Sequence, residues 1–215
     1  MWRIYRLLPV WDFIPPLDLA YEAIYVERHL VKDKVGCQDQ LMAAMGGFNL
    51  VEFRKEDDIV VSRVTMTPER MAEFEEHIFI VFTGIKRRAA HVVEKQLKRV
   101  GDNRETLKLM RSMVDKGWDI LTSNQCLSAF GELLDQAWQA KRSLDVGISN
   151  GDIDRIYHQG REAGAWGGKL LGAGAGGFML FFAPPSVHSH LAETFKDHQV
   201  LSVKINAPGS QIIFS

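Results

Sequence analysis

The hydrophobic pattern of the chain first becomes periodic after the proline pair at positions 15 and 16. From Asp18 onward, apolar residues recur at spacings of four, three and four, which is typical of one face of an amphipathic helix. The members of this stripe are Leu19, Ala23, Val26 and Leu30. Because Asp18 is placed to cap the helix, we expect the helix to begin there.

Shorter elements follow in the next part of the chain. Residues 37–45 predict a short helix that a glycine pair ends. Residues 47–53 and 58–66 predict two strands around a charged turn. Residues 77–84 form a continuous apolar run with β-branched and aromatic side chains, which predicts a strand buried on both faces.

The middle of the chain has a helical pattern. Residues 87–99 and 104–122 carry dense Lys, Arg, Glu, Leu and Met, and a Gly-Asp-Asn sequence separates them. A third helix is expected at about 126–144. Ser149 with Asp152 three residues later resembles a capping box and predicts the start of a fourth helix.

The last quarter of the chain returns to strands. A glycine-dense turn is followed by a predicted strand at 178–183, a helix that reaches about residue 198 and two short terminal strands. With antiparallel strands at both ends and a helical middle, the predicted fold class is α+β.

Composition narrows the function classes. Hydrophobic residues make up 46% of the chain and charged residues 25%, as in ordinary globular proteins. The 26 basic residues against 27 acidic ones give a net charge of −1, which leaves no excess to neutralise nucleic-acid phosphates or anionic lipid. Cys37 and Cys126 form no disulfide framework, and no signal sequence is recognisable. We therefore expect no nucleic-acid partner, no membrane partner and a cytoplasmic location.

Seven glycines fall within the fourteen residues 164–177. Each glycine in a regular element costs about 0.5–1 kcal/mol of chain entropy, so such a cluster indicates positive φ angles or close approaches. Backbone amides in such a turn can converge on an anion such as phosphate, and a tight structural turn is the alternative. A dinucleotide-binding fingerprint is excluded because a strand, not a helix, follows the glycines, and a Walker loop is excluded because no Lys-Ser or Lys-Thr follows them.

The glycine segment and three upstream blocks resemble one family. Residues 164–182 read GAWGGKLLGAGAGGFMLFF, which is similar to the third conserved motif of the GHMP small-molecule kinases. Residues 130–157, 81–96 and 36–49 resemble blocks that precede this motif in the sugar-phosphate branch, in the same order. The resemblance covers about residues 18–215 and is strongest to the D-glycero-D-manno-heptose 7-phosphate kinases.

The resemblance implies both a fold and a reaction. The fold is a truncated GHMP N-terminal domain followed by a ferredoxin-like C-terminal domain, with boundaries at 1–17, 18–84 and 85–215. The reaction is phosphorylation of a sugar or sugar phosphate by ATP with Mg²⁺, with D-glycero-D-manno-heptose 7-phosphate phosphorylated at its anomeric hydroxyl as the expected case. The expected partners are this small molecule and, as a candidate, a second copy of the chain in a homodimer.

The resemblance also assigns the site residues. Asp39 is the expected catalytic acid, which orients or deprotonates the acceptor hydroxyl, although an aspartate in a first helical turn is also ordinary helix chemistry. The expected substrate-binding residues are Gly36, Cys37, Gln38, Arg87, Lys141 and Arg142. The expected nucleotide-loop residues are Gly172, Gly174, Gly176 and Gly177. No metal site is assigned, because His188 and His190 are two positions apart on a predicted helix.

Two basic positions keep alternative interpretations. Lys141 lies on the apolar stripe of its helix, so it either extends its amine to solvent or, with Arg142, faces a phosphate-bearing substrate. Arg87 opens a predicted helix, and its side chain either lies on a solvated face or contacts a sugar phosphate.

The sequence departs from the family pattern in two ways. It lacks the two earlier GHMP motifs, including the loop that wraps the ATP phosphates, so it is interpreted as a fragment, an internal start or a degenerate copy, and the chain as given is expected to be a poor kinase or an inactive one. The alternative function is a non-catalytic remnant that binds a ligand or a protein. The branch also usually has a glycine at position 175, where this chain has Ala175, at a cost of about 1 kcal/mol if the position needs positive φ.

Overall fold

The computed structural model describes residues 14–33, 36–54, 58–85, 101–172 and 174–211. The chain divides into two compact units, one of Met1–Phe48 with Ile205–Ser215 and one of Asn49–Lys204. The two units meet after residues 48 and 204 of the chain, whereas the family resemblance predicts a boundary after residue 84.

The first unit is a pair of helices joined to the C-terminal segment. Helix α1 (Pro16–Tyr25) continues into the π-helix η1 (Val26–Leu30) and packs against α2 (Gln38–Met45). The amide of Gly47 donates to the carbonyl of Ala207 at 2.7 Å, and the amide of Ser210 donates to the carbonyl of Ala43 at 2.9 Å. These bonds hold the C-terminal segment along the end of α2.

The predicted start and face of α1 are wrong. The helix begins at Pro16 with Pro15 as its N-cap, so Asp18 lies in the first turn instead of capping it. Proline is well suited to the first helical position because its amide would have no partner there. The buried residues are Ala20 and Ile24, whereas Val26 is 43% and Leu30 63% exposed.

The second unit contains a β-hairpin and a four-stranded sheet. Strands β1 (Asn49–Phe53) and β2 (Ile59–Arg63) form the hairpin that the sequence predicts. The sheet contains β3 (Ile78–Phe82), β4 (Gly167–Leu170), β5 (Phe178–Phe182) and β6 (Val200–Leu201). The order is β4-β5-β3-β6, and every neighbouring pair is antiparallel.

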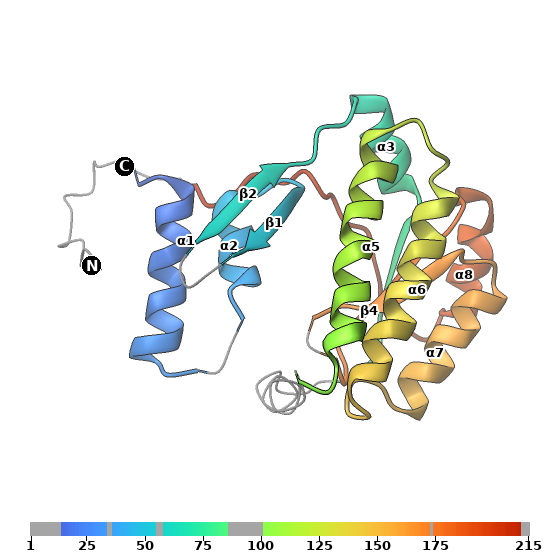
Figure 1. Ribbon diagram of the computed structural model, residues 1–215. Helices are drawn as coiled ribbons and strands as arrows, with labels where there is room; N and C mark the ends of the chain where they lie inside the picture. The colour runs from blue at the N-terminus through green and yellow to red at the C-terminus, as the bar shows by residue number, and fades with distance from the viewer. Residues whose placement is uncertain (1–13, 34–35, 55–57, 86–100, 173, 212–215) are drawn as a thin grey trace. The chain divides into compact units, whose positions relative to one another are not determined.

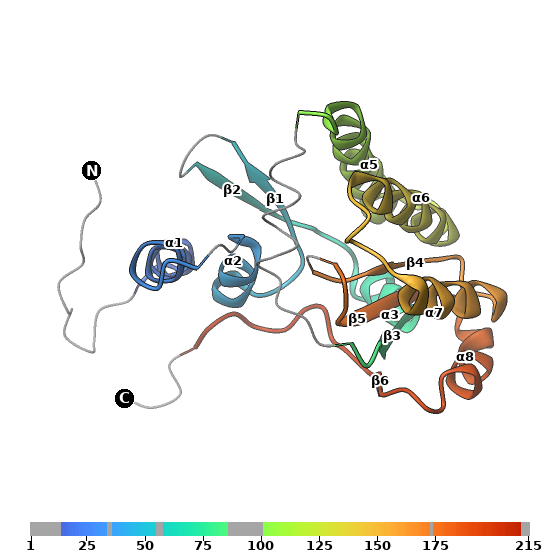
Figure 2. The ribbon, with the colours of Figure 1, turned by 90° about the horizontal axis from the view of Figure 1, so that it is seen from below.

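Helices fill the connections between these strands. They are α3 (Pro68–Glu76) before β3; α5 (Arg104–Thr122), α6 (Ser128–Leu144) and α7 (Gly151–Glu162) between β3 and β4; and the 3₁₀ turn η2 (Pro185–Val187) with α8 (His188–Thr194) between β5 and β6. Helices α6 and α7 pack on β4, and α5 packs on α6 (Figures 1 and 2). Strand, helices, two strands, helix and strand in this order give the ferredoxin-like arrangement, so the predicted α+β fold class is confirmed.

Aromatic side chains form much of the core on both faces of the sheet, because the neighbouring residues Phe181 and Phe182 of β5 point to opposite faces. Trp138, Phe181, Phe182 and Phe195 are fully buried. The rings of Phe181 and Phe195 stack with centroids 5.5 Å apart, which joins β5 to the end of α8. Helix α6 approaches β4 closely, because a Cβ added to Gly167 would overlap the carbonyl oxygen of Gly131. Small residues at this contact therefore fix the distance between α6 and the sheet.

Two predicted elements differ in detail. Helix α7 is capped by Asn150, whose side-chain oxygen accepts from the amides of Asp152 and Ile153 at 3.0 and 3.1 Å. Ser149, the predicted cap, instead donates to the Asp154 carboxylate at 2.5 Å. The helix expected to reach about residue 198 ends at Thr194, and the predicted helix 87–99 lies wholly within 86–100, outside the described residues.

Candidate functional site

The glycine loop connects β4 to β5 and is held at both ends by backbone hydrogen bonds. The amide of Ala175 donates to the carbonyl of Ile148 at 2.9 Å, and the amide of Gly177 donates to the carbonyl of Ile85 at 3.0 Å. The hydroxyl of Thr83 donates to the carbonyl of Gly177 at 2.8 Å. The loop is therefore fixed to the end of β3 and to the segment before α7.

Two glycines of the loop lie against other backbone segments. A Cβ at Gly176 would lie 2.6 Å from the carbonyl oxygen of Ile85, and one at Gly174 would lie 3.0 Å from that of Ile148. Their φ angles of 158° and 115° also disfavour a side chain. The close approach that the sequence predicts is thus an approach of backbone to backbone.

Three amides of the loop remain available for a ligand. The N–H groups of Gly172, Gly174 and Gly176 donate to none of the residues that the structure describes. A turn with several amides that lack a protein acceptor fits a phosphate group, since each amide can donate to a phosphate oxygen. The loop therefore satisfies the chemical requirement for the nucleotide or substrate phosphates that the sequence assigns to it.

Lys141 contacts this loop directly. Its ammonium group donates to the carbonyl of Gly172 at 2.5 Å from the last turns of α6. Burial, and then the nearby charge of Lys169, lower the pKa of Lys141 to about 8. Burial also lowers the pKa of Lys169, on β4. The amine of Lys141 therefore contacts the glycine loop, and its assignment to a phosphate-bearing substrate stays a prediction.

Arg142 has different neighbours. Its guanidinium forms an ion pair with Asp154 on α7 at 2.9 Å and donates to the side chain of Gln139 at 3.3 Å. The guanidinium carbon Cζ of Arg142 lies 6.0 Å from the centre of the Trp138 ring. The partners of Arg142 therefore lie on α6 and α7, whereas Lys141 contacts the glycine loop.

Asp39 and its predicted neighbours surround the start of α2 in the first unit. Asp39 lies in the first turn and is exposed, as are Gly36 and Gln38, while Cys37 is half-buried at the N-cap position. The next residue, Gln40, is buried, and its amide nitrogen donates to the carboxylate of Glu27 at 2.5 Å. This contact secures α2 to the preceding helix and leaves the carboxylate of Asp39 facing outward. Arg87 lies outside the described residues.

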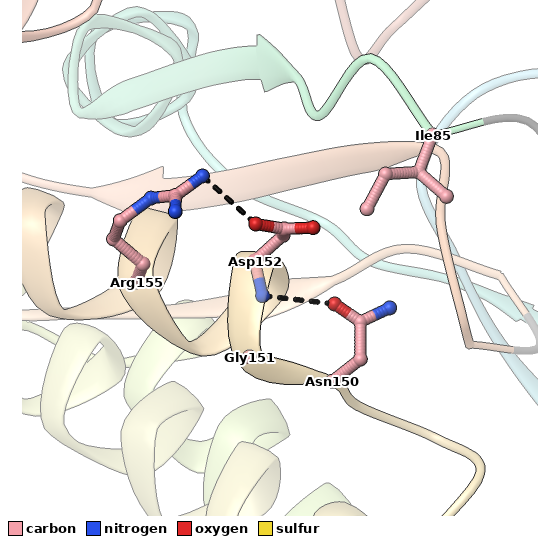
Figure 3. A pocket seen from close by; sticks show the side chains of 5 residues that line it. All are labelled: Ile85, Asn150, Gly151, Asp152 and Arg155. Carbon is pink, nitrogen blue, oxygen red and sulfur yellow. Dashed lines mark hydrogen bonds and ion pairs between the residues drawn. The ribbon is translucent and has the colours of Figure 1, made fainter.

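A shallow cavity of about 590 Å³ opens where α7 begins, and the sequence analysis did not predict it. It is lined by Ile85, Asn150, Gly151, Asp152 and Arg155 (Figure 3). Arg155 and Asp152 form an exposed ion pair at 2.9 Å, and Ile85 is the residue whose carbonyl anchors Gly177. The cavity therefore shares a backbone segment with the glycine loop, and its polar lining already has internal partners.

Within the described parts of the chain, no group of three or more His, Cys, Asp or Glu side chains could hold a metal ion. His188 packs edge-on against Phe79, with ring centroids 5.5 Å apart, and one of its ring nitrogens lies 3.3 Å from the carbonyl oxygen of Ala183. The same parts contain no helix long and apolar enough to cross a membrane.

Comparison with known proteins identifies relatives of this chain. The family model described as GHMP kinases C terminal matches residues 119–197, which run from the end of α5 past α8. The chain is 32% identical to D-glycero-alpha-D-manno-heptose 7-phosphate kinase from Campylobacter jejuni over 186 residues, which cover 84% of the chain and 53% of that relative. It is 28% identical to mevalonate kinase from Pyrococcus furiosus over 78% of the chain and 50% of that relative. The chain thus spans about half the length of these two relatives.

Solved structures agree on the fold. A D-glycero-D-manno-heptose 1-phosphate kinase from Bacteriodes thetaiotaomicron is similar with a TM-score of 0.63 and 22% identity, over 94% of this chain and 57% of that one. The mevalonate kinase from Methanococcus jannaschii is similar with a TM-score of 0.67 and 20% identity, over 88% of this chain and 56% of that one. The resemblance predicted from the four sequence blocks is confirmed.

Proposed function

We propose that this chain, which carries the C-terminal domain of the GHMP kinases, forms part of an ATP-dependent kinase that phosphorylates a sugar phosphate. The observation that carries the proposal is the anchored glycine loop, with three amides that have no acceptor among the described residues and a lysine amine on its carbonyl. The proposed acceptor is D-glycero-D-manno-heptose 7-phosphate, phosphorylated at its anomeric hydroxyl. The 32% identity to the heptose 7-phosphate kinase from Campylobacter jejuni supports this choice.

The loop would act by holding charge in place. Phosphoryl transfer depends mainly on positioning and on donors that are fixed before the reaction, because negative charge spreads over the phosphate oxygens in the transition state. The hydrogen bonds of Ala175 and Gly177 hold the backbone of the loop, so its remaining amides keep their directions without a ligand. When bound, ATP would supply the transferred phosphoryl group and Mg²⁺ would neutralise charge on it, and the amides of Gly172, Gly174 and Gly176 would hold these phosphates.

Asp39 is the proposed acid–base residue for the acceptor hydroxyl. A carboxylate within hydrogen-bond reach of the hydroxyl can orient it and accept its proton. The exposed carboxylate of Asp39 in the first turn of α2 is accessible to a ligand, and the start of a helix stabilises a negative charge. Gly36, Cys37 and Gln38 are proposed as the neighbouring substrate contacts, and Arg87 and Arg142 as further basic contacts.

The test combines binding with transfer. The purified chain is titrated calorimetrically with heptose 7-phosphate, fucose and mevalonate, and each acceptor is then incubated with ATP and Mg²⁺ and followed by ³¹P NMR. We expect binding of heptose 7-phosphate in preference to the other two, and a new anomeric phosphate signal that grows far more slowly than at ordinary kinase rates. Selective binding without any transfer would instead support the non-catalytic, ligand-binding alternative. Equal or absent binding of all three would contradict the proposed acceptor.

A further inference from the structure

Lys141 and Lys169 share the space between α6 and β4. Gly167 faces α6, because a Cβ there would overlap the carbonyl oxygen of Gly131. Side chains two residues apart on a strand point to the same face, so Lys169 also extends toward α6. Lys141 enters the same region from α6 and donates to the carbonyl of Gly172. Two positive charges are thus brought together at the base of the glycine loop.

Among the residues that the structure describes, these two lysines have no carboxylate partner, in contrast to three other lysines. Lys108, Lys196 and Lys204 are mostly exposed, and each forms an ion pair with a glutamate at 2.7–2.9 Å. Lys141 and Lys169 are partly buried, and neither pairs with a carboxylate of the described residues. Removing ammonium groups from water without a partner is unfavourable, so such an arrangement indicates a ligand that supplies the negative charge.

We propose that Lys141 and Lys169 bind one phosphate group at the base of the glycine loop, and that this group is the phosphate already carried by the acceptor sugar. The inference deepens the proposed function and rests on it for the identity of the acceptor. Lys141 has two N–H donors left after its bond to Gly172, and Lys169 has three that contact none of the described acceptors. Two ammonium groups match the two charges of a phosphomonoester better than the single charge of a carboxylate.

The same chemistry could serve a nucleotide phosphate, and the experiment separates the two sources. Wild-type chain, Lys141→Met, Lys169→Met and the control Lys116→Met are titrated calorimetrically with inorganic phosphate, mannose 6-phosphate, mannose and ADP. Lys116 is exposed on α5 and lies outside the proposed site. Circular dichroism on each variant shows whether it is folded before its affinity is compared.

We expect each site variant to weaken binding of inorganic phosphate and mannose 6-phosphate about 10- to 100-fold, the size expected for one charge-assisted hydrogen bond. Lys116→Met and the binding of mannose should be unaffected. A loss confined to ADP would overturn the acceptor assignment and give the site to the nucleotide. Unchanged phosphate affinity in both folded variants, or no measurable phosphate binding by the wild type, would refute the inference.

The outcome is independent of the transfer assay. Phosphate binding that depends on both lysines, without phosphoryl transfer to any acceptor, would support the binding site together with the non-catalytic, ligand-binding alternative. Transfer to heptose 7-phosphate that survives both substitutions with unchanged KM would support the kinase function and contradict the site.

Discussion

Replacing Lys141 with methionine should stabilise the chain near neutral pH. Methionine has a similar length and no charge, so it removes an ammonium group that burial and Lys169 destabilise. The pKa of Lys141 falls from 10.5 to about 8 on folding. Since one pKa unit corresponds to about 1.4 kcal/mol, the charge opposes folding by up to about 3 kcal/mol. Residual contact with solvent reduces this figure to about 2 kcal/mol.

The substitution also removes the hydrogen bond to Gly172, which contributes about 1 kcal/mol. The net gain is therefore about 1 kcal/mol at pH 7, or a rise in Tm of about 2–4 °C for a chain of this size. Thermal unfolding followed by circular dichroism measures it, with Lys116→Met as the matched exposed control, for which we expect little change.

The pH dependence of stability independently tests the sign of the predicted effect of Lys141→Met. Because the pKa of Lys141 is lower in the folded chain, the unfolded chain binds more protons between pH 8 and pH 10.5. The contribution of Lys141 to wild-type stability therefore rises with pH across that window, and the full penalty is present below it. The advantage of Lys141→Met should accordingly disappear by about pH 10.5. The reasoning would be refuted if Lys141→Met were less stable than wild type at pH 7 and the difference were the same at pH 10.

Three further substitutions test the site and its supports. Gly177→Ala should lower the free energy of unfolding by about 1–2 kcal/mol, because its φ is 101° but the space around it is open. Gly176→Ala should cost at least twice as much, because its Cβ would lie 2.6 Å from a carbonyl oxygen. Equal losses in chemical denaturation would contradict the proposed contact. Asn150→Ala should lower the free energy of unfolding by about 1 kcal/mol through loss of the α7 cap, and an unchanged urea midpoint would exclude this role. Asp39→Asn should lower kcat about 10²–10⁴-fold in an active preparation with little change in ATP affinity, and near-normal turnover would remove Asp39 from the mechanism.

Elements with a strong local pattern were predictable from the sequence. The predicted helix 104–122 has the same bounds as α5, and the hairpin and the buried strand at 77–84 are present. In these segments the apolar spacing and the turn residues agree, so local preference and tertiary packing favour the same structure. The ferredoxin-like order of the strands required the family resemblance, because strand pairing depends on contacts distant in sequence.

The face of α1 was not predictable from spacing. The amide of Val31 donates to the carbonyl of Val26, five residues earlier, so the chain leaves α-helical register there. A stripe based on α-helical spacing therefore does not apply after Tyr25, which accounts for the exposure of Val26 and Leu30. The predicted cap of α7 was wrong for a simpler reason. Ser149 and Asn150 are both good capping residues, and the sequence pattern does not distinguish between two neighbours.

The sequence analysis found Lys141 but overlooked Lys169. A charge on the apolar stripe of α6 is conspicuous, whereas Lys169 lies within the glycine-rich motif and was interpreted only as part of it. The usable signal was its position in β4, where the neighbouring Gly168 and Leu170 are buried and a lysine is unexpected. Only the structure shows that the charge of Lys169 lies close to that of Lys141, whose amine contacts the loop.

Ala175 explains how the loop keeps its conformation. Its φ of 65° is the left-handed value that the sequence analysis identified as a cost for alanine. The residue is nonetheless buried, and its amide donates to the carbonyl of Ile148. Two residues later, the amide of Gly177 donates to the carbonyl of Ile85. A strained residue persists only where its surroundings fix it. The two anchors therefore impose the loop geometry, and they hold in place the neighbouring amides of Gly172, Gly174 and Gly176, which have no acceptor among the described residues.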